Sequence, residues 1–281
     1  MKTKNIVKKI SSFAIIIALA VSTTACSKTS NQPADPEVKT IKVGFCPGPY
    51  ADMFKEAIEP SLVEKGYKIE SVEFSDYVQP NISLADKEID VNLFQHSIYL
   101  KNFAEERSLD LTYLKEVPTA GMGIFSEKYK TLDEVPDGAT VAIPNDATNL
   151  SRAIRVLEQT GLVKIDPSID ASKATQNTLS ENPKNLKFAE IEAPQLPRSL
   201  DSVDIAIVNG NFAIGAGLKL SDALYNEKLQ DGYVNVIAVR TEDKDSQLSK
   251  DIIEIVESDA FKKVIEDPNK QYISFHKPKD Y

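Results

Sequence analysis

The fold of this chain is constrained most by a repeated alternation between short strand patterns and amphipathic helix patterns. Ile41, Val43 and Phe45 alternate with polar or small residues, which predicts a strand that ends at the turn sequence Pro47-Gly48-Pro49. Further strand patterns cover residues 69–74, 89–94, 121–126, 140–143, 204–208 and 233–239. Strands that alternate with helix-sized intervals are typical of the α/β class.

Helix patterns fill several of the intervals between these strands. An apolar stripe on one face of a predicted helix consists of Leu150, Ala153, Ile154 and Leu157. Gly161 follows that stripe at the place where glycine commonly ends a helix. Another helix begins near Met53, and Pro60 must kink or end it. Helical patterns also cover residues 82–87 and 248–265, so the order of elements is that of βα units.

Residues 1–25 have the pattern of a bacterial export signal. Four lysines precede an apolar run from Phe13 to Val21, which is about half of the roughly 20 apolar residues that a spanning helix needs. Thr23-Thr24-Ala25-Cys26 resembles the lipobox of bacterial lipoproteins, although Thr23 replaces the usual leucine. We therefore predict removal of residues 1–25, lipidation of Cys26 and a polar tether over residues 26–39. An ordinary secretory signal with an incidental cysteine is the alternative.

Charge and cysteine content exclude several classes of protein. The formal net charge is -9, and no basic stripe with interleaved aromatic residues is present, so nucleic acid is not an expected partner. Once Cys26 carries lipid, only Cys46 remains, and no internal disulfide can form. Stability must therefore come from packing, and we expect Cys46 to be a small buried residue.

The stretch from Pro144 to Arg152 is the most informative for function. Turn and capping residues run directly into a helix that has an arginine in its predicted first turn. A helix start offers free N–H groups and a positive dipole end, which suit a carboxylate, and Arg152 adds a planar fork for the same group. Alternatively, Asn149 only caps the helix and Arg152 forms a surface ion pair. The physical chemistry of these residues leaves both interpretations open.

Aromatic residues follow two of the predicted strands, in residues 73–77 and 94–99. Ligand sites of open α/β sheets lie beyond the carboxyl ends of the strands and often between domains. Export and two βα units together suggest two lobes around a cleft, with an apolar pocket that has a polar rim.

Several motifs in the right order resemble the NlpA/MetQ family of methionine-binding lipoproteins. They are Phe94-Gln95-His96, Tyr99, Pro144-Asn145-Asp146-Ala147-Thr148-Asn149-Leu150, Glu181-Asn182-Pro183-Lys184 and Glu192-Ala193-Pro194-Gln195-Leu196-Pro197-Arg198. The resemblance extends from Ile41 to about Phe261. It implies a two-lobed, type II-like periplasmic-binding-protein fold with a ligand cleft between the lobes.

The family's fold implies two crossings between the lobes, near residues 118–123 and 233–239. The first lobe would then comprise residues 40–120 and 236–281, and the second lobe residues 121–235. Departures from the family pattern are Ser151 for a usual glycine, Phe212 for a usual tyrosine, an unusual Cys46 that is expected near the cleft, and an unfamiliar tail over residues 271–281.

The resemblance also implies the binding residues. An aromatic wall around the ligand's thioether would consist of Tyr77, Phe94, His96 and Tyr99. A polar end would consist of Asn149 and Arg152, which hold the carboxylate, together with Asn209 and Asn235. Sulfur against ring edges contributes roughly 0.3–1.5 kcal/mol per contact, and a charge-assisted hydrogen bond about 1.5–3 kcal/mol. The arginine should therefore dominate affinity, and the rings should set selectivity.

The function implied is that of a substrate-binding protein of an ABC importer, anchored by lipid on Cys26 to the extra-cytoplasmic face of the cell membrane. Its expected ligand is methionine, with L-methionine first. Its expected partners are a membrane permease and the permease's cytoplasmic ATPase. Alternatives are a methionine derivative or a methionine-containing dipeptide as ligand, or a surface adhesin on the same fold.

Enzymatic functions find little support in the sequence. The chain has only two histidines, His96 and His276, and His276 lies in a tail with no predicted structure. No Gly-x-Ser-x-Gly elbow and no metal-ligand spacing occur. We therefore expect no catalytic residues, no metal site and no cofactor.

Overall fold

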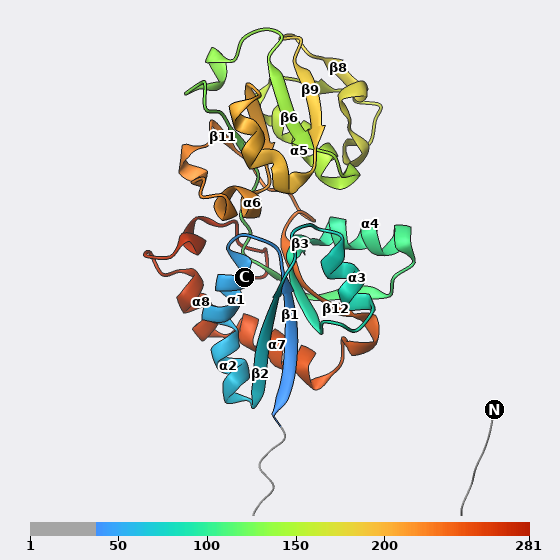
Figure 1. Ribbon diagram of the computed structural model, residues 1–281, viewed down its shortest axis with the longest axis vertical. Helices are drawn as coiled ribbons and strands as arrows, with labels where there is room; N and C mark the ends of the chain where they lie inside the picture. Colours follow the sequence, from blue (N-terminus) through green and yellow to red (C-terminus); the bar gives the residue numbers. More distant parts are fainter. Residues whose placement is uncertain (1–37) are drawn as a thin grey trace, which may run out of the picture. The chain divides into compact units, whose positions relative to one another are not determined.

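Two five-stranded sheets organise residues 38–281, the part of the chain that the computed structural model describes (Figure 1). The predicted signal peptide, the lipidation site and almost all of the predicted tether lie outside the described residues. Each sheet has helices on both faces and forms one lobe. The α/β class and the two-lobed arrangement expected from the sequence are thus confirmed.

The first sheet has the strand order β2-β1-β3-β12-β4. Its strands are β1 (Lys39–Phe45), β2 (Tyr67–Glu73), β3 (Val91–His96), β4 (Leu111–Val117) and β12 (Asn235–Arg240). β1 pairs in parallel with β2 and β3, whereas β12 runs antiparallel between β3 and β4. The carboxyl ends of β2 and β3 therefore point to the same edge, where the predicted aromatic residues follow.

Helices cover both faces of the first sheet. One face packs against α1 (Tyr50–Ala57), α2 (Glu59–Glu64), α7 (Gln247–Glu257) and α8 (Asp259–Ile265). The other face packs against α3 (Gln79–Ala85) and α4 (Ser97–Arg107) (Figure 1). Along β12, Ile237 and Val239 face the first group, and Val236 and Ala238 face the second. Since side chains alternate along a strand, burial of both faces explains the unbroken apolar run of β12.

The second sheet has the strand order β11-β5-β10-β6-β9. Its strands are β5 (Gly123–Phe125), β6 (Thr140–Pro144), β9 (Lys187–Ile191), β10 (Ile205–Val208) and β11 (Tyr225–Asn226). One face packs against α5 (Ala147–Thr160), and the other against the 3₁₀ segment Ala193–Asp201 and α6 (Gly210–Gly215). A small hairpin of β7 (Lys164–Ile165) and β8 (Leu179–Glu181) follows α5.

Local sequence explains where several helices begin and end. Gly161 adopts a left-handed conformation, with φ +78°, and ends α5 as predicted. Pro60 lies in the first turn of α2, after α1 has ended at Ala57, so the predicted break is confirmed. The helical pattern predicted over residues 248–265 is confirmed, and it is divided into two helices, α7 and α8. The Ser258 hydroxyl accepts a hydrogen bond from the Phe261 N–H, which starts α8 as a separate helix.

The chain passes between the sheets twice. The first passage covers residues 118–122, between β4 and β5, within the predicted range. The second covers residues 227–234, between β11 and β12. It lies earlier than the predicted range of 233–239, because β12 is already part of the first sheet. The lobe boundaries drawn from the sequence stay a prediction.

The tail is ordered against the first passage, contrary to the expectation of an unstructured end. Tyr272 and Phe275 are buried in the core of the first lobe. The backbones of His276 and Thr119 exchange two hydrogen bonds of 2.8 and 2.9 Å. The tail therefore pairs with one of the two segments that link the lobes.

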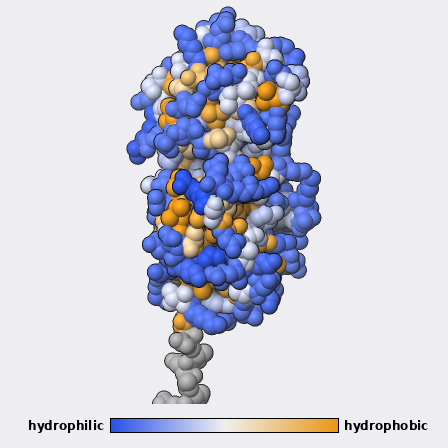
Figure 2. All heavy atoms as spheres, turned by 90° about the vertical axis from the view of Figure 1, so that its right-hand side faces the viewer, coloured by the Kyte–Doolittle hydropathy of each residue, from blue (hydrophilic) through white to orange (hydrophobic). Residues whose placement is uncertain are grey.

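The surface is mostly polar on the face shown in Figure 2. Exposed large apolar side chains are few and far apart in the sequence: Val38, Val63, Tyr113, Ile169 and Ile273. Among residues 38–281, no helix has the length and apolar character that crossing a membrane requires.

Candidate functional site

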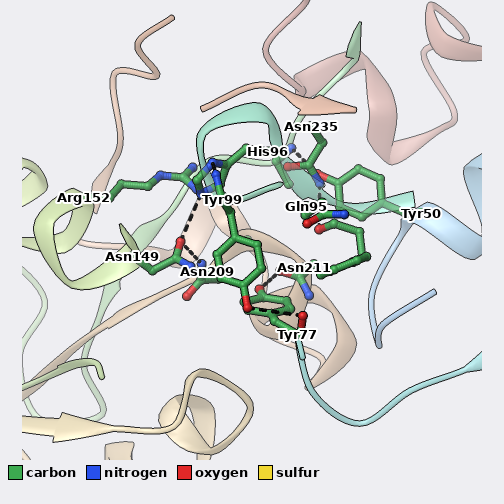
Figure 3. Close-up of a pocket in the computed structure, with 13 residues that line it drawn as sticks. Tyr50, Tyr77, Gln95, His96, Tyr99, Asn149, Arg152, Asn209, Asn211 and Asn235 are labelled. Atoms are coloured by element: carbon green, nitrogen blue, oxygen red, sulfur yellow. Dashed lines mark hydrogen bonds between the residues drawn. The ribbon is translucent and has the colours of Figure 1, made fainter. Parts of the chain in front are cut away.

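A small cavity lies between the two lobes. All eight predicted binding residues line it (Figure 3). They are Tyr77, Phe94, His96, Tyr99, Asn149, Arg152, Asn209 and Asn235. The sequence interpretation missed the other lining residues, namely Tyr50, Gln95, Ala120, Gly210 and Asn211.

The aromatic residues form one wall of the cavity, and all of them come from the first lobe. Tyr77 follows β2, Phe94 lies in the second half of β3, and Tyr99 lies in the first turn of α4. The Tyr77 ring centroid is 5.6 Å from that of Phe94 and 5.7 Å from that of Tyr99. These separations are typical of aromatic pairs, so the wall is a packed cluster with little freedom to rearrange.

His96 lies at the junction of the wall and the polar end. Its Nδ1 accepts a hydrogen bond of 3.1 Å from the Tyr99 N–H and so caps α4. Burial, followed by the nearby Arg152 charge, holds the pKa of His96 well below its usual value. The ring is therefore neutral, with its proton on Nε2, which lies 3.4 Å from the Asn149 Oδ1.

Asp146, and not Asn149, is the N-cap of α5. Its carboxylate accepts hydrogen bonds of 2.9 Å from the Asn149 N–H and 3.0 Å from the Asn149 Nδ2. The first turn of α5 thus already binds a carboxylate of the chain itself. Asn149 is 1% exposed, and its amide is oriented by Asp146 with Oδ1 directed away from the cap. The capping role that the sequence left open for Asn149 is therefore wrong.

An amide hydrogen bond joins Asn149 to Asn209, which also belongs to the second lobe. The Asn209 Nδ2 donates to the Asn149 Oδ1 over 2.9 Å, which fixes the direction of the Asn209 amide. The Asn209 Oδ1 is buried and has no hydrogen-bond partner among the described residues. A buried, unsatisfied acceptor costs about 1–3 kcal/mol, so this oxygen is suited to accept from a donor on a ligand.

Arg152 lies in the second turn of α5, not the first, and is 5% exposed. Its Nε and Nη2 donate to the two carboxylate oxygens of Glu227 over 2.8 and 2.6 Å. Its guanidinium carbon is 5.1 Å from the centroid of the Tyr233 ring. Burial lowers the pKa of Arg152, but the Glu227 carboxylate more than offsets this, so the pKa is raised overall. The alternative of a surface ion pair is wrong, because both partners are buried.

Several of the lining residues also form hydrogen bonds that hold the walls of the cavity. The Asn235 Nδ2 donates to the Phe94 carbonyl oxygen over 3.1 Å. The Gln95 side chain is paired with Asn81, and the Tyr50 hydroxyl accepts a hydrogen bond of 3.1 Å from the Ala120 N–H. Tyr50 had no motif to mark it, because it follows an ordinary turn sequence.

Direct contacts join the lobes beside the cavity. The Tyr77 hydroxyl donates to the Asn211 Oδ1 over 2.6 Å, and the Asn211 Nδ2 donates to the Pro47 carbonyl oxygen over 3.0 Å. Phe212, which replaces the family's usual tyrosine, stacks on Tyr77 with a centroid separation of 4.8 Å. Phe212 of the second lobe thus packs against the aromatic wall without lining the cavity.

Cys46 does not line the cavity, although the sequence suggested a place near the cleft. It is buried behind the wall, against Phe94 and Phe103, and its thiol donates to the Asp76 carbonyl oxygen. Burial, followed by the charge of Asp76, raises the pKa of the thiol well above its usual value. Cys46 is therefore an inert packing residue in this fold.

The geometry of the cavity is typical of one class of protein. A wall of aromatic rings from the first lobe and buried polar residues of the second lobe line the same cavity. This arrangement is that of a two-lobed substrate-binding protein. Within residues 38–281, no group of three or more His, Cys, Asp or Glu side chains is placed to hold a metal ion.

Comparison with known proteins identifies the family. The family model described as NlpA lipoprotein matches residues 41–274, and the chain belongs to this family. It is 35% identical over 256 residues to the D-methionine-binding lipoprotein MetQ of Escherichia coli K12, covering 89% of this chain and 92% of the relative. It is 36% identical over 265 residues to the methionine-binding lipoprotein MetQ of Bacillus subtilis, covering 92% and 95%.

Solved structures agree with this assignment. A nutrient binding protein from Burkholderia cenocepacia, solved bound to methionine, superposes with a TM-score of 0.77 at 35% identity. That match covers 83% of this chain and 97% of the Burkholderia chain. The resemblance deduced from the sequence motifs is confirmed, and the chain is a substrate-binding protein rather than an enzyme.

Proposed function

We propose that this chain captures methionine and delivers it to an ABC importer. The observation that carries the proposal is the single cavity in which Tyr77, Phe94 and Tyr99 face the buried Arg152 and Asn209. The wall of rings suits a soft, unbranched thioether, because sulfur gains from ring edges without a matched charge. The far edge of the Arg152 guanidinium suits the ligand carboxylate, and the Asn209 Oδ1 suits the ammonium group.

In this proposal the preferred ligand is L-methionine. The names of the relatives, which give D-methionine for the Escherichia coli protein, support methionine as the ligand class. In this proposal the ligand bridges the lobes and favours the arrangement in which Tyr77 contacts Asn211. That arrangement docks on a membrane permease, which a cytoplasmic ATPase drives. Lipid on Cys26 keeps the protein at the extra-cytoplasmic face of the membrane.

Calorimetry on the purified, ligand-stripped protein tests the binding step. The titrants are L-methionine, D-methionine, methionine sulfoxide and glycyl-methionine, with L-alanine as a small control. One-to-one binding that is tightest for L-methionine supports the proposal. Tightest binding of the sulfoxide or the dipeptide favours a methionine derivative instead. Absence of heat with every titrant favours the surface adhesin.

Replacement of Arg152 tests the carboxylate assignment. Arg152→Ala should weaken methionine binding by about 2–5 kcal/mol, since it removes one partner of a buried charged contact. Arg240→Ala is a matched control, because Arg240 is also a mostly buried, ion-paired arginine, but it lies on β12 away from the cavity. Unchanged affinity in Arg152→Ala would refute the assignment.

The anchoring step has its own test. Cys26→Ser should move the protein from the membrane fraction to the soluble fraction of the cells that produce it. Retention in the membrane fraction would contradict a lipid on Cys26.

A further inference from the structure

The Arg152–Glu227 pair has a geometry that restricts what a ligand can do at this site. The Glu227 carboxylate accepts hydrogen bonds from the Nε–H and one Nη2–H of the guanidinium, over 2.8 and 2.6 Å. A guanidinium has five N–H donors in a planar fork, so only its far edge remains for a ligand carboxylate. Glu227 therefore sets the direction in which Arg152 presents that edge to the cavity.

Glu227 is itself held by the segments that link the lobes. Its Oε2 accepts a hydrogen bond of 2.8 Å from the Met122 N–H, and its own N–H donates to the Met122 carbonyl oxygen over 2.9 Å. Met122 ends the first passage between the lobes, and Glu227 begins the second. The opposite support for Arg152 is the Tyr233 ring, which also belongs to the second passage. Arg152 is thus fixed against both linking segments.

The charged groups around the cavity do not provide the excess positive charge that a site for a simple anion needs. Arg152 is the one charged residue among those that line the cavity, and Glu227, 4% exposed, neutralises it. Asp146 adds a second carboxylate behind Asn149, and His96 is neutral. A ligand that brought only a carboxylate would meet one cation that is already paired, beside a further acid.

We propose that Glu227 is a positioning and charge-balancing residue that restricts this site to ligands carrying an ammonium group beside the carboxylate. The site would then select α-amino acids against the matching carboxylic acids, which lack the amino group. The inference rests on the proposed function, because it takes methionine as the ligand. It assigns no direct ligand contact to Glu227.

The test compares two ligands that differ only in the amino group, L-methionine and 4-(methylthio)butanoate, by calorimetry on the full exported domain. The measured quantity is the ratio of their dissociation constants. The ratio is the dissociation constant of 4-(methylthio)butanoate divided by that of methionine. In the Glu227→Gln variant, the acid should gain affinity relative to methionine, so this ratio should fall by about 10-fold or more. That size is expected when a buried charge is removed at an effective dielectric constant of about 20. A role limited to structure would change both affinities by the same factor.

Two further variants complete the design. Asp251→Asn is the matched control, because Asp251 is a buried, ion-paired carboxylate in the first lobe, away from the cavity. It should lower thermal stability and leave the ratio unchanged. Glu227→Asp keeps the charge and shortens the side chain, so it should weaken both ligands alike. If Glu227→Gln does not fold, a shift of more than about threefold in the Glu227→Asp ratio overturns the proposal.

The outcomes separate this inference from the proposed function. If the wild-type protein does not bind methionine, the proposed function fails. If it binds methionine and Glu227→Gln leaves the ratio at the wild-type value, the proposed function stands and the role of Glu227 is refuted.

Discussion

Removal of one hydroxyl group, in Tyr77→Phe, should weaken methionine binding by about 1–2 kcal/mol, or roughly 5–30-fold in the dissociation constant. The Tyr77 hydroxyl donates to the Asn211 Oδ1 over 2.6 Å and joins the first lobe to the second. Burial raises the pKa of Tyr77 well above its usual value, so the hydroxyl stays a donor. The net value of a neutral hydrogen bond is about 0.5–1.5 kcal/mol, and the buried oxygen left without a donor raises the cost.

The substitution keeps the ring and its stacking on Phe212, so the pocket wall should survive. Because the lost bond joins the lobes, the effect should appear in calorimetric affinity and hardly at all in the unfolding temperature of the ligand-free protein. Tyr129→Phe is the matched control, since the Tyr129 hydroxyl contacts Asp204 within the second lobe only. Equal affinities for Tyr77→Phe and Tyr129→Phe would refute the view that ligand binding draws on this contact between the lobes.

Three further predictions follow from the same geometry. Phe94→Ala should reduce the preference for methionine over alanine about 2–10-fold, as expected for one lost sulfur–ring contact, and equal losses for both ligands would contradict the aromatic wall. Gly48→Ala should weaken binding at least about 10-fold in calorimetry, because Gly48 has φ +131° and an added Cβ would lie 2.5 Å from the Asn211 carbonyl oxygen; wild-type affinity would refute this. The lowered pKa of His96 means that only the unfolded chain binds a proton there in mild acid, so stability is lost as pH falls below about 6.5. His96→Asn keeps an acceptor for the Tyr99 N–H. Between pH 7.5 and 5.5, its free energy of unfolding in urea should fall by up to about 1.4 kcal/mol less than that of the wild type. Parallel pH profiles of the free energy of unfolding would refute the assignment.

Much of the fold was predictable because strand and helix periodicities in this chain are strong. The apolar alternation around Val43 and the stripe that includes Ile154 mark the centres of β1 and α5 correctly. The sequence interpretation did not assign α4 and β4, because their burial patterns are mixed and their apolar residues do not keep one period. It also missed β9, a short strand at the sheet edge with partly exposed residues.

The site was predictable where a residue belongs to a motif, and not where its role depends on a distant partner. His96 and Asn149 lie in motifs that the family resemblance covers, and both line the cavity. Glu227 lies 75 residues from Arg152 in a segment with no distinctive pattern, so only the fold brings the two together. The exchange of capping roles between Asp146 and Asn149 likewise depends on rotamers, which sequence spacing does not determine.

The first sheet combines early strands, β1 to β4, with the late strand β12, and this has a consequence for the order of folding. The strands of the second lobe, from β5 to β11, are contiguous in sequence, so this lobe can fold as soon as it has been translated. The first lobe needs β12 between β3 and β4, a pairing of high sequence separation that slows folding. Its earlier strands must therefore wait for β12 before the first sheet is complete, so the second lobe can finish folding before the first.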